Sequence, residues 1–220
     1  MNTAQKLERP KSLTDMAIES IRSSIVEGRL SLGEHLSEAA LALSLGISKT
    51  PVREALLQLR GEGLVEIHPQ RGTYVFKVNH DDVVQICRFR EILESAALAG
   101  AMAHDRIGLV TELDANLRTP KTKRALPDLD ADFHGVVMRR SGNEYLRSAY
   151  GLIEHKIHAL RWRLPQHNEQ IAECQQNHAV IVERMREGKV AQAQTLLKQH
   201  IRETQEAYLQ AGDQRTSSAA

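Results

Sequence analysis

Three histidines and one aspartate stand out because they are polar residues at inward positions of predicted helices. His178 and His200 each lie on the apolar stripe of a helix near the C-terminus. Asp130 and His134 are four residues apart, so both side chains reach the same point on a helix. One inward histidine is more often a hydrogen-bonded core residue than a ligand, but three with a carboxylate are costly to bury without a shared partner. These four residues form a ligand set for a divalent metal ion, zinc first, with nickel or manganese as alternatives.

Arg90 is another polar residue on an apolar stripe, between Ile86 and Leu93. Its guanidinium is therefore expected to point into the protein, where it needs a carboxylate that it can bind through planar, two-point contacts. That carboxylate could belong to a Glu or Asp of the same bundle, or to a bound ligand. The pattern leaves both interpretations open.

The stretch "GISKTPVREAL" (residues 46–56) combines hydroxyl residues, a proline and two cations at the start of a helical pattern. Ser48 or Thr50 fits the N-cap, and proline is tolerated in the first turn because its missing N–H would have no intrahelical partner there. Lys49 and Arg53, four residues apart, share the face opposite the apolar residues. Free amides, hydroxyls and cations at a helix N-terminus suit phosphate oxygens and base edges, so the stretch predicts a DNA recognition helix.

The helices before this stretch complete a helix-turn-helix. Apolar residues at helical spacing predict a first helix that begins at Leu13 and is closed by Gly28. Ser37 then caps a short helix that Gly46 ends. Two short helices joined by a turn that contains glycine are typical of this motif.

Two β-patterned segments follow the recognition helix. "EGLVEI" (62–67) and "TYVFKV" (73–78) predict two strands, with Arg71 and Gly72 at the tip of the turn between them. A hairpin at this point is the wing of a winged helix. The alternative that pattern alone leaves open is an ordinary small α/β domain with a capped surface helix.

The remainder of the chain has a helical pattern nearly throughout. The predicted helices are 81–103, 106–118, 126–141, 143–164, 168–187 and 190–212. Six helices with short connections indicate an antiparallel bundle. The expected fold is mainly α, with a winged helix-turn-helix of three helices and a β-hairpin over 12–78 and an all-α bundle over 79–212. Disordered tails are expected at 1–11 and 213–220.

Composition narrows the class of protein further. A chain of 220 residues is long enough for two domains. No stretch approaches the roughly 18 consecutive apolar residues of a membrane span, so we expect a cytoplasmic protein without a membrane partner. Cys87 and Cys174 each stand alone and are expected to be core residues. The net charge of +1 does not indicate a nucleic-acid partner, so the case for DNA binding depends on local pattern.

The segment "GRLSLGEHLSEAALALSLGISKTPVREALLQLRGEGLVEIHPQRGTYV" resembles the DNA-binding domain of the GntR family of bacterial transcription regulators. The resemblance runs from about Ser12 to Val78 and is most specific at "S-x-T-P-V-R-E-A-L" and "L-x-x-E-G-L-V". One departure is Ala39, where several relatives carry an arginine, so one phosphate contact is missing. The resemblance implies DNA contacts by Ser48, Lys49, Thr50, Arg53, Arg71 and Gly72.

The C-terminal region resembles the FCD effector domain of FadR-type GntR regulators. The motifs that carry this resemblance are "R-x-x-L-E" from Arg90, "D-x-x-F-H" from Asp130, "S-G-N" from Ser141, and two histidines 22 residues apart. In metal-binding members of the subfamily one Asp and three His hold a divalent ion. The resemblance places those ligands on Asp130, His134, His178 and His200.

Other positions depart from the subfamily or have no counterpart in it. Asn177 stands where the subfamily usually has a glutamate. It precedes the ligand His178, so this departure affects the surroundings of the ligand and not the ligand itself. His155 and His158 match none of the subfamily's ligands and are expected to be structural or surface residues.

The resemblance also implies that the effector is a small organic acid that approaches the metal. Arg90, with Arg161 or Arg163, is expected to hold the far end of the acid, and the "S-G-N" motif makes Asn143 a further candidate contact.

The sequence therefore predicts a metabolite-responsive transcription regulator. We expect a homodimeric repressor that binds a palindromic operator in double-stranded DNA and responds to a small carboxylate. A metalloenzyme with a DNA-binding appendage is one alternative, although no His-Glu-x-x-His or comparable motif supplies its general base. A structural DNA-binding protein with an inert, metal-stabilised bundle is the other.

Overall fold

Helix α1 (Leu13–Val26) begins the part of the chain that the computed structural model describes, which comprises residues 11–120, 122–164 and 168–217. The side chains of residues 168–175 and 212–217 are outside this description. The chain divides into two units, Met1–Lys77 and Val78–Ala220, one residue from the predicted domain boundary.

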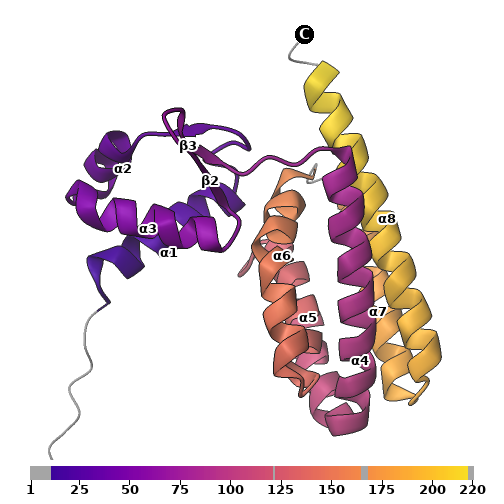
Figure 1. Cartoon of the computed structure of the whole chain (residues 1–220). Coiled ribbons are helices and arrows are strands. Elements are labelled where there is room, and N and C mark those ends of the chain that lie inside the picture. Colours follow the sequence, from indigo (N-terminus) through magenta and orange to yellow (C-terminus); the bar gives the residue numbers. More distant parts are fainter. Residues whose placement is uncertain (1–10, 121, 165–167, 218–220) are drawn as a thin grey trace, which may run out of the picture. The chain divides into compact units, whose positions relative to one another are not determined.

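The N-terminal unit contains the predicted helix-turn-helix (Figure 1). Ser12 and Asp15 form a capping box at the start of α1, and Ser37 caps α2 (Glu38–Leu45). Gly46 ends α2 with a φ of 66°, a left-handed conformation that glycine adopts without strain. Helix α3 (Lys49–Gly61) follows. Its buried stripe packs against α1, and the buried residues of the two helices are Ala17, Ile18, Ile21, Ile25, Val26, Val52, Ala55, Leu56 and Leu59.

The wing is a sheet of three antiparallel strands, where two were predicted. Strands β2 (Val65–His68) and β3 (Gly72–Val75) form the expected hairpin, and β1 (His35–Leu36) pairs with the other edge of β3, in the order β1-β3-β2. Both hairpin strands are shorter than predicted. β2 begins late because residues 62–64 first close the end of α3, where Gly63 has a φ of 73°.

The C-terminal unit is the predicted helical bundle. The predicted break between 103 and 106 is confirmed at Asp105, which leaves helical geometry inside α4 (His80–Leu117), with φ −154° and ψ 75°. Its Oδ1 accepts a hydrogen bond from the backbone N–H of Gly108, so two helical segments meet here across a kink. Asn79 begins α4 with a capping box that uses Asp82.

Helix α4 lies at the centre of the bundle and packs against all four later helices (Figure 1). These are α5 (Leu126–Arg140), α6 (Glu144–Arg163), α7 (Asn168–Arg186) and α8 (Val190–Ser217). Helix α8 continues to Ser217, so residues 213–217 are helical and the predicted tail is wrong there.

Cys87 is buried in the bundle core as expected, while the side chain of Cys174 lies outside the description. No described helix is long and apolar enough to cross a membrane.

Candidate functional site

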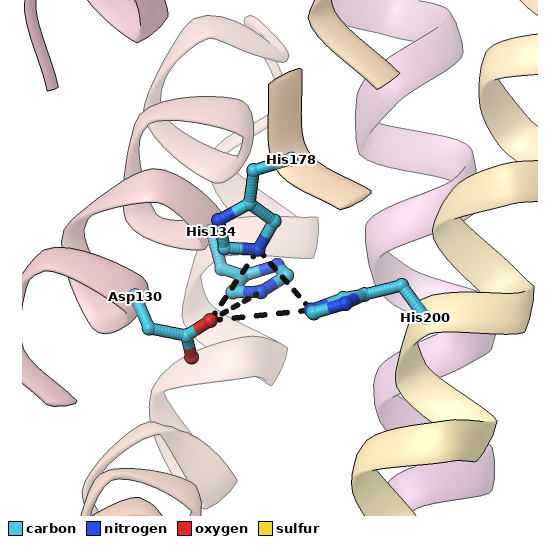
Figure 2. A group of neighbouring side chains, drawn as sticks. All are labelled: Asp130, His134, His178 and His200. Atoms are coloured by element: carbon cyan, nitrogen blue, oxygen red, sulfur yellow. Dashed lines mark hydrogen bonds and ion pairs between the residues drawn. The ribbon is translucent and has the colours of Figure 1, made fainter. Parts of the chain in front are cut away.

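The aspartate and the three histidines meet inside the bundle (Figure 2). Helix α5 supplies Asp130 and His134, separated by one turn, while α7 supplies His178 and α8 supplies His200. One ligand atom from each residue lies within 4.8 Å of the others. The three imidazoles are buried, and the carboxylate is nearly so. The fold therefore brings together the residues that the sequence predicted as metal ligands.

The distances between these atoms match a metal coordination shell. Oδ1 of Asp130 lies 3.3, 3.6 and 3.9 Å from Nε2 of His178, His134 and His200. The Nε2 atoms of His178 and His200 are 3.1 Å apart. Ligand atoms that lie about 2.1 Å from a zinc ion are roughly 3.4 Å apart in a tetrahedral shell and about 3.0 Å apart at right angles. Three of the four distances lie near this spacing, and the 3.9 Å between Asp130 and His200 is longer. Four donor atoms thus converge on one point in the bundle, where one ion could contact them.

The electrostatics of the cluster leave its donor atoms available to a cation. Burial lowers the pKa of His178 well below its usual value and that of His200 to about 3, so both imidazoles are neutral near pH 7. Burial alone would raise the pKa of Asp130, but Arg161 and His134 outweigh it and hold that pKa well below its usual value. The cluster therefore contains one carboxylate and two neutral imidazoles, which is the state in which these groups bind a metal.

One orphaned atom also supports the fit to a metal ion. Nε2 of His134 is fully buried and has no hydrogen-bond partner among the described residues, although it faces the cluster. A buried nitrogen without a partner is costly unless something binds it. The ring of His178 is meanwhile held in place by Phe133, which stacks on it with ring centroids 3.7 Å apart.

Arg90 forms the structural ion pair that its sequence position left open, and its contact with a ligand stays a prediction. Its side chain is 0% exposed, and its Nε donates to Oε1 of Glu94 over 2.6 Å, which is the structural ion pair. Its Nη1 and Nη2 are buried and have no partner in the described part of the chain. The outer end of the guanidinium therefore remains available to a further anion.

Arg161 is buried beside the metal cluster and forms an ion pair through Nε with Oδ2 of Asp130. Its Nη2 has no hydrogen-bond partner among the described atoms. Arg163 instead uses Nη1 to donate to the backbone oxygen of Ala159, over 2.7 Å. Of these two arginines, Arg161 is the one that reaches the site.

Asn143 is not part of this cluster. Its side chain is exposed at the start of α6, and its amide oxygen accepts hydrogen bonds from the backbone N–H groups of Tyr145 and Leu146. The structure places Asn143 at a helix cap, and its contact with an effector stays a prediction. An asparagine just before a helix is a common N-cap, and this signal was already present in the sequence.

Two tyrosines that sequence reasoning missed lie beside the arginines. Tyr150 on α6 and Tyr208 on α8 are buried, and their hydroxyls have no partner among the described residues. Arg90 and Arg161 both interact electrostatically with each tyrosine and with Asp130. Spacing could have indicated one of them, because Tyr150 and Arg161 are separated by about three helical turns and so share a face.

His158 forms a separate contact on the bundle. Nε2 of His158 lies 2.9 Å from Oδ1 of Asp128, and Nε1 of Trp162 donates to the same oxygen over 3.2 Å. His158 and its neighbour His155 are absent from the metal cluster, which agrees with their predicted structural role.

The predicted DNA-contacting side chains of α3 lie at its N-terminus. Ser48 is the N-cap residue, but its side chain makes no capping hydrogen bond, so its hydroxyl is available to another partner. Lys49, Thr50 and Arg53 are exposed in the first turns. Arg53 forms an ion pair with Glu38 at the start of α2.

The tip of the wing presents the other two predicted DNA contacts. Arg71 is exposed, and its backbone oxygen accepts a hydrogen bond from the hydroxyl of Tyr74. Gly72 has a φ of 108°, and a Cβ there would come within 2.8 Å of Nε2 of His35. The turn therefore requires glycine at this position for both conformation and space.

Together, the winged helix-turn-helix and the helical bundle with its polar centre define a DNA-binding regulator with a ligand-binding domain. Residues 13–75 match the family "Bacterial regulatory proteins, gntR family", and residues 85–203 match the FCD domain. The chain therefore belongs to the GntR family of regulators and carries an FCD domain, as the sequence motifs predicted.

Individual relatives agree with this assignment. An HTH-type transcriptional regulator of Streptomyces ambofaciens is 33% identical over 187 residues, which are 83% of this chain and 79% of that protein. A protein named "Probable D-xylose utilization operon transcriptional repressor", from Paenarthrobacter nicotinovorans, is 27% identical over 204 residues, 90% of this chain and 89% of its own.

A solved structure confirms the fold. The transcriptional regulator GntR from Rhodococcus sp. RHA1 superimposes with a TM-score of 0.76 at 20% identity, over 91% of this chain and 99% of that one. The protein is thus a DNA-binding transcription regulator. Its family and relatives are regulators and not enzymes, so the metalloenzyme alternative is wrong.

Proposed function

We propose that this protein is a homodimeric repressor that releases a palindromic operator when a small organic acid binds at a divalent metal ion in the bundle. Asp130, His134, His178 and His200 would hold the ion. Zinc suits a set of three imidazoles and one carboxylate best, and nickel and manganese are the alternatives. When bound, the ion would supply a Lewis-acid contact for a carboxylate of the effector.

The observation that carries this proposal is the pair of unpartnered nitrogens on Arg90. Nη1 and Nη2 are buried in a region that also contains Arg161 and the two tyrosine hydroxyls, and neither nitrogen has a partner among the described residues. A planar pair of N–H donors matches a carboxylate in a two-point contact. An acid that spans the site would place one carboxylate near the metal ligands and the other on Arg90.

Charge balance favours an acid with two negative charges. Arg90 and Arg161 are cancelled by Glu94 and Asp130, because both carboxyl groups have pKa values well below their usual range and are ionised. A divalent ion with neutral imidazole ligands then leaves two positive charges in a buried site. A dicarboxylate would neutralise them, while a monocarboxylate would leave a buried charge uncompensated.

The form of the DNA-bound protein follows from the same family membership. A winged helix reads a short half-site, so a palindromic operator requires a two-fold dimer. The Paenarthrobacter relative is named a repressor, which supports repression as the role of this protein too. Because it acts on chromosomal DNA, we place the protein in the cytoplasm. Size measurement at micromolar concentration tests the dimer, and a monomer that still bound palindromic DNA would contradict it.

Control by the acid requires different affinities for two arrangements of the dimer. An acid can shift the placement of the winged helices only if it binds one arrangement more tightly than the other. The remaining alternative is a structural DNA-binding protein whose bundle is inert. In that case an acid could bind without any effect on DNA affinity.

A titration distinguishes the two functions. A duplex selected from a random DNA pool by the wild-type protein would be labelled and bound, and mono-, di- and tricarboxylates would then be added. We expect one or more dicarboxylates to release the duplex without being consumed. Arg90→Lys keeps a cation beside Glu94 but loses the planar pair of N–H donors, so it should weaken that response. Release by no acid, from protein with full metal content, would favour the inert bundle.

A further inference from the structure

Glu94 is a buried carboxylate that the ligand set does not include. It lies on α4, one turn from Arg90, and its side chain is 0% exposed. Its two oxygens have different partners. Oε1 accepts from Nε of Arg90 over 2.6 Å, and Oε2 lies 2.6 Å from Nδ1 of His134 on α5. Glu94 thus connects the arginine of the proposed effector site to one of the proposed metal ligands.

The charge of Glu94 determines the direction of the bond to His134. Glu94 forms a buried ion pair with Arg90 over 2.6 Å, so its carboxylate is ionised. An ionised carboxylate can only accept hydrogen bonds, so the proton of this bond must be on Nδ1 of His134. In the neutral ring that a metal ligand requires, Nε2 then carries the lone pair, and it faces Oδ1 of Asp130, 3.6 Å away.

This tautomer is the one that metal binding needs. A neutral imidazole carries one N–H, and the hydrogen bond at one nitrogen decides which nitrogen remains free to bind a metal. Without an acceptor at Nδ1, the proton could move to Nε2 and occupy the ligand position. The 2.6 Å contact also restrains rotation of the ring, which packs against Phe133 in a T-shaped arrangement.

Arg90 compensates the negative charge of the buried Glu94 carboxylate. A charged Glu94 without a cation in the core would be strongly destabilising. Only Nε of the guanidinium is used for this purpose, since Nη1 and Nη2 have no partner among the described groups. The arginine can therefore neutralise Glu94 and still present two donors to a ligand.

We propose that Glu94 is a positioning residue for the metal site, which holds His134 with Nδ1 protonated and Nε2 directed at the ion. This role rests on the proposed metal site, but it assigns a function to a residue that binds neither metal nor effector. Partners that orient a ligand in this way typically contribute 10- to 100-fold to metal affinity. We expect a loss of that size when the carboxylate is removed.

The test uses the full-length protein, stripped of metal and titrated with Co²⁺ and with Zn²⁺. Glu94→Gln preserves the shape but lets an amide N–H face Nδ1, which favours the wrong tautomer. We expect its affinity for both ions to fall about 10- to 100-fold and the visible Co²⁺ spectrum to change. Ser95→Ala is the matched control, because Ser95 is a buried neighbour on α4 that bonds Gln194 and not the cluster. Its affinity should equal that of the wild type.

A second pair of variants covers the case in which Glu94→Gln fails to fold. Arg90→Gln with Glu94→Gln removes both charges, which is far less destabilising than removing one. We expect the folded double variant to bind Co²⁺ at least tenfold more weakly than the wild type. In the zinc-loaded wild type, imidazole ¹⁵N NMR should show His134 protonated at Nδ1.

The outcomes separate this inference from the metal site itself. An affinity equal to that of the wild type, in Glu94→Gln or in the double variant, would overturn the role of Glu94 and leave the metal site standing. Protonation of His134 at Nε2 in the zinc form would overturn it as well. Failure of the wild type to bind either ion stoichiometrically would overturn both proposals together.

Discussion

Arg53 and Glu38 form a two-point ion pair between the recognition helix and the helix before it. Nη2 of Arg53 donates to Oε2 of Glu38 over 2.7 Å, and Nε donates to Oε1 over 3.1 Å. The pair lies on the exposed face of α3, and Nη1 of Arg53 takes no part in these bonds. The side chain proposed to read DNA is thus exposed and keeps a donor that is outside the ion pair.

Replacing Arg53 should remove specific DNA binding without affecting the fold. Each good contact to a base or phosphate contributes roughly 5- to 150-fold in affinity, and a dimer loses it twice in Arg53→Ala. The ion pair with Glu38 is exposed, so its loss should leave the melting temperature nearly unchanged. Gel shifts with the selected duplex, beside circular dichroism, measure both effects.

Arg60→Ala is the matched control, because Arg60 is an exposed arginine in the last turn of the same helix. Its specific affinity should stay close to that of the wild type. Thr50→Ala should have a smaller effect than Arg53→Ala, since it removes one neutral hydrogen bond. If Arg53→Ala and Arg60→Ala lowered affinity equally, the cause would be general charge and not groove recognition.

Metal removal should lower thermal stability. An ion bound by residues of α5, α7 and α8 stabilises the folded chain because the unfolded chain has no assembled site. At 100 times its dissociation constant the ion contributes about 2.7 kcal/mol, which is roughly 5 to 10 °C for a domain of this size. Melting curves with and without chelator measure the difference, and metal analysis gives the stoichiometry.

His178→Ala should lower metal content and remove the effect of the chelator, while DNA binding without effector is impaired less. His104→Ala is the control, because His104 is exposed on α4 and outside the cluster. If the wild type contained no stoichiometric metal and its melting temperature did not change in chelator, the metal site would be contradicted. The four residues would then form only a polar network in the core.

The metal-free protein should become less stable as the pH falls below about 6.5. His200 has a folded pKa of about 3 against an ordinary value of 6.5, so between these values the unfolded chain binds a proton that the folded chain does not. The free energy of unfolding then falls by up to about 1.4 kcal/mol per pH unit for each such proton. The lowered pKa of His178 acts in the same direction, and neither group affects the slope above about pH 7.5.

Urea unfolding of chelator-treated protein at several pH values between 7 and 5 measures this slope. His200→Gln cannot titrate, so the free energy of unfolding should change less steeply with pH, by up to about 1.4 kcal/mol per pH unit, the contribution of one proton. The same slope in His200→Gln and the wild type would show that His200 is accessible to protons in the folded state.

Tyr208→Phe should separate effector binding from stability. The hydroxyl is buried and unpaired among the described residues, so removing it should leave the melting temperature unchanged or slightly higher. If the hydroxyl binds the effector, its loss should weaken the acid response by roughly 2- to 12-fold, the value of one neutral hydrogen bond. Operator release by the active acid measures this, with metal content as the internal control. An unchanged acid response would remove Tyr208 from the effector site.

Local sequence patterns determined most of the elements and the family of this protein. Helical spacing, caps such as Ser37 and breaks such as Gly46 act within a few residues, so they are visible before the chain folds. Asp130 and His134 share one helix, and their mutual reach follows from its pitch. The two-residue strand β1 is too short to show any period, and only its pairing with β3 makes it a strand.

Tertiary structure decided which of the inward polar groups meet. Helical period shows that His178, His200 and Arg90 face inward, but not which helices pack around them. That packing brings the ligand atoms of α5, α7 and α8 within 4.8 Å and places Glu94 of α4 between Arg90 and His134, 40 residues away in the chain. It also leaves donors of Arg90 and Tyr208 without partners among the described residues. Neighbours from distant segments decide whether a buried polar group has a hydrogen-bond partner, and no local pattern specifies those neighbours.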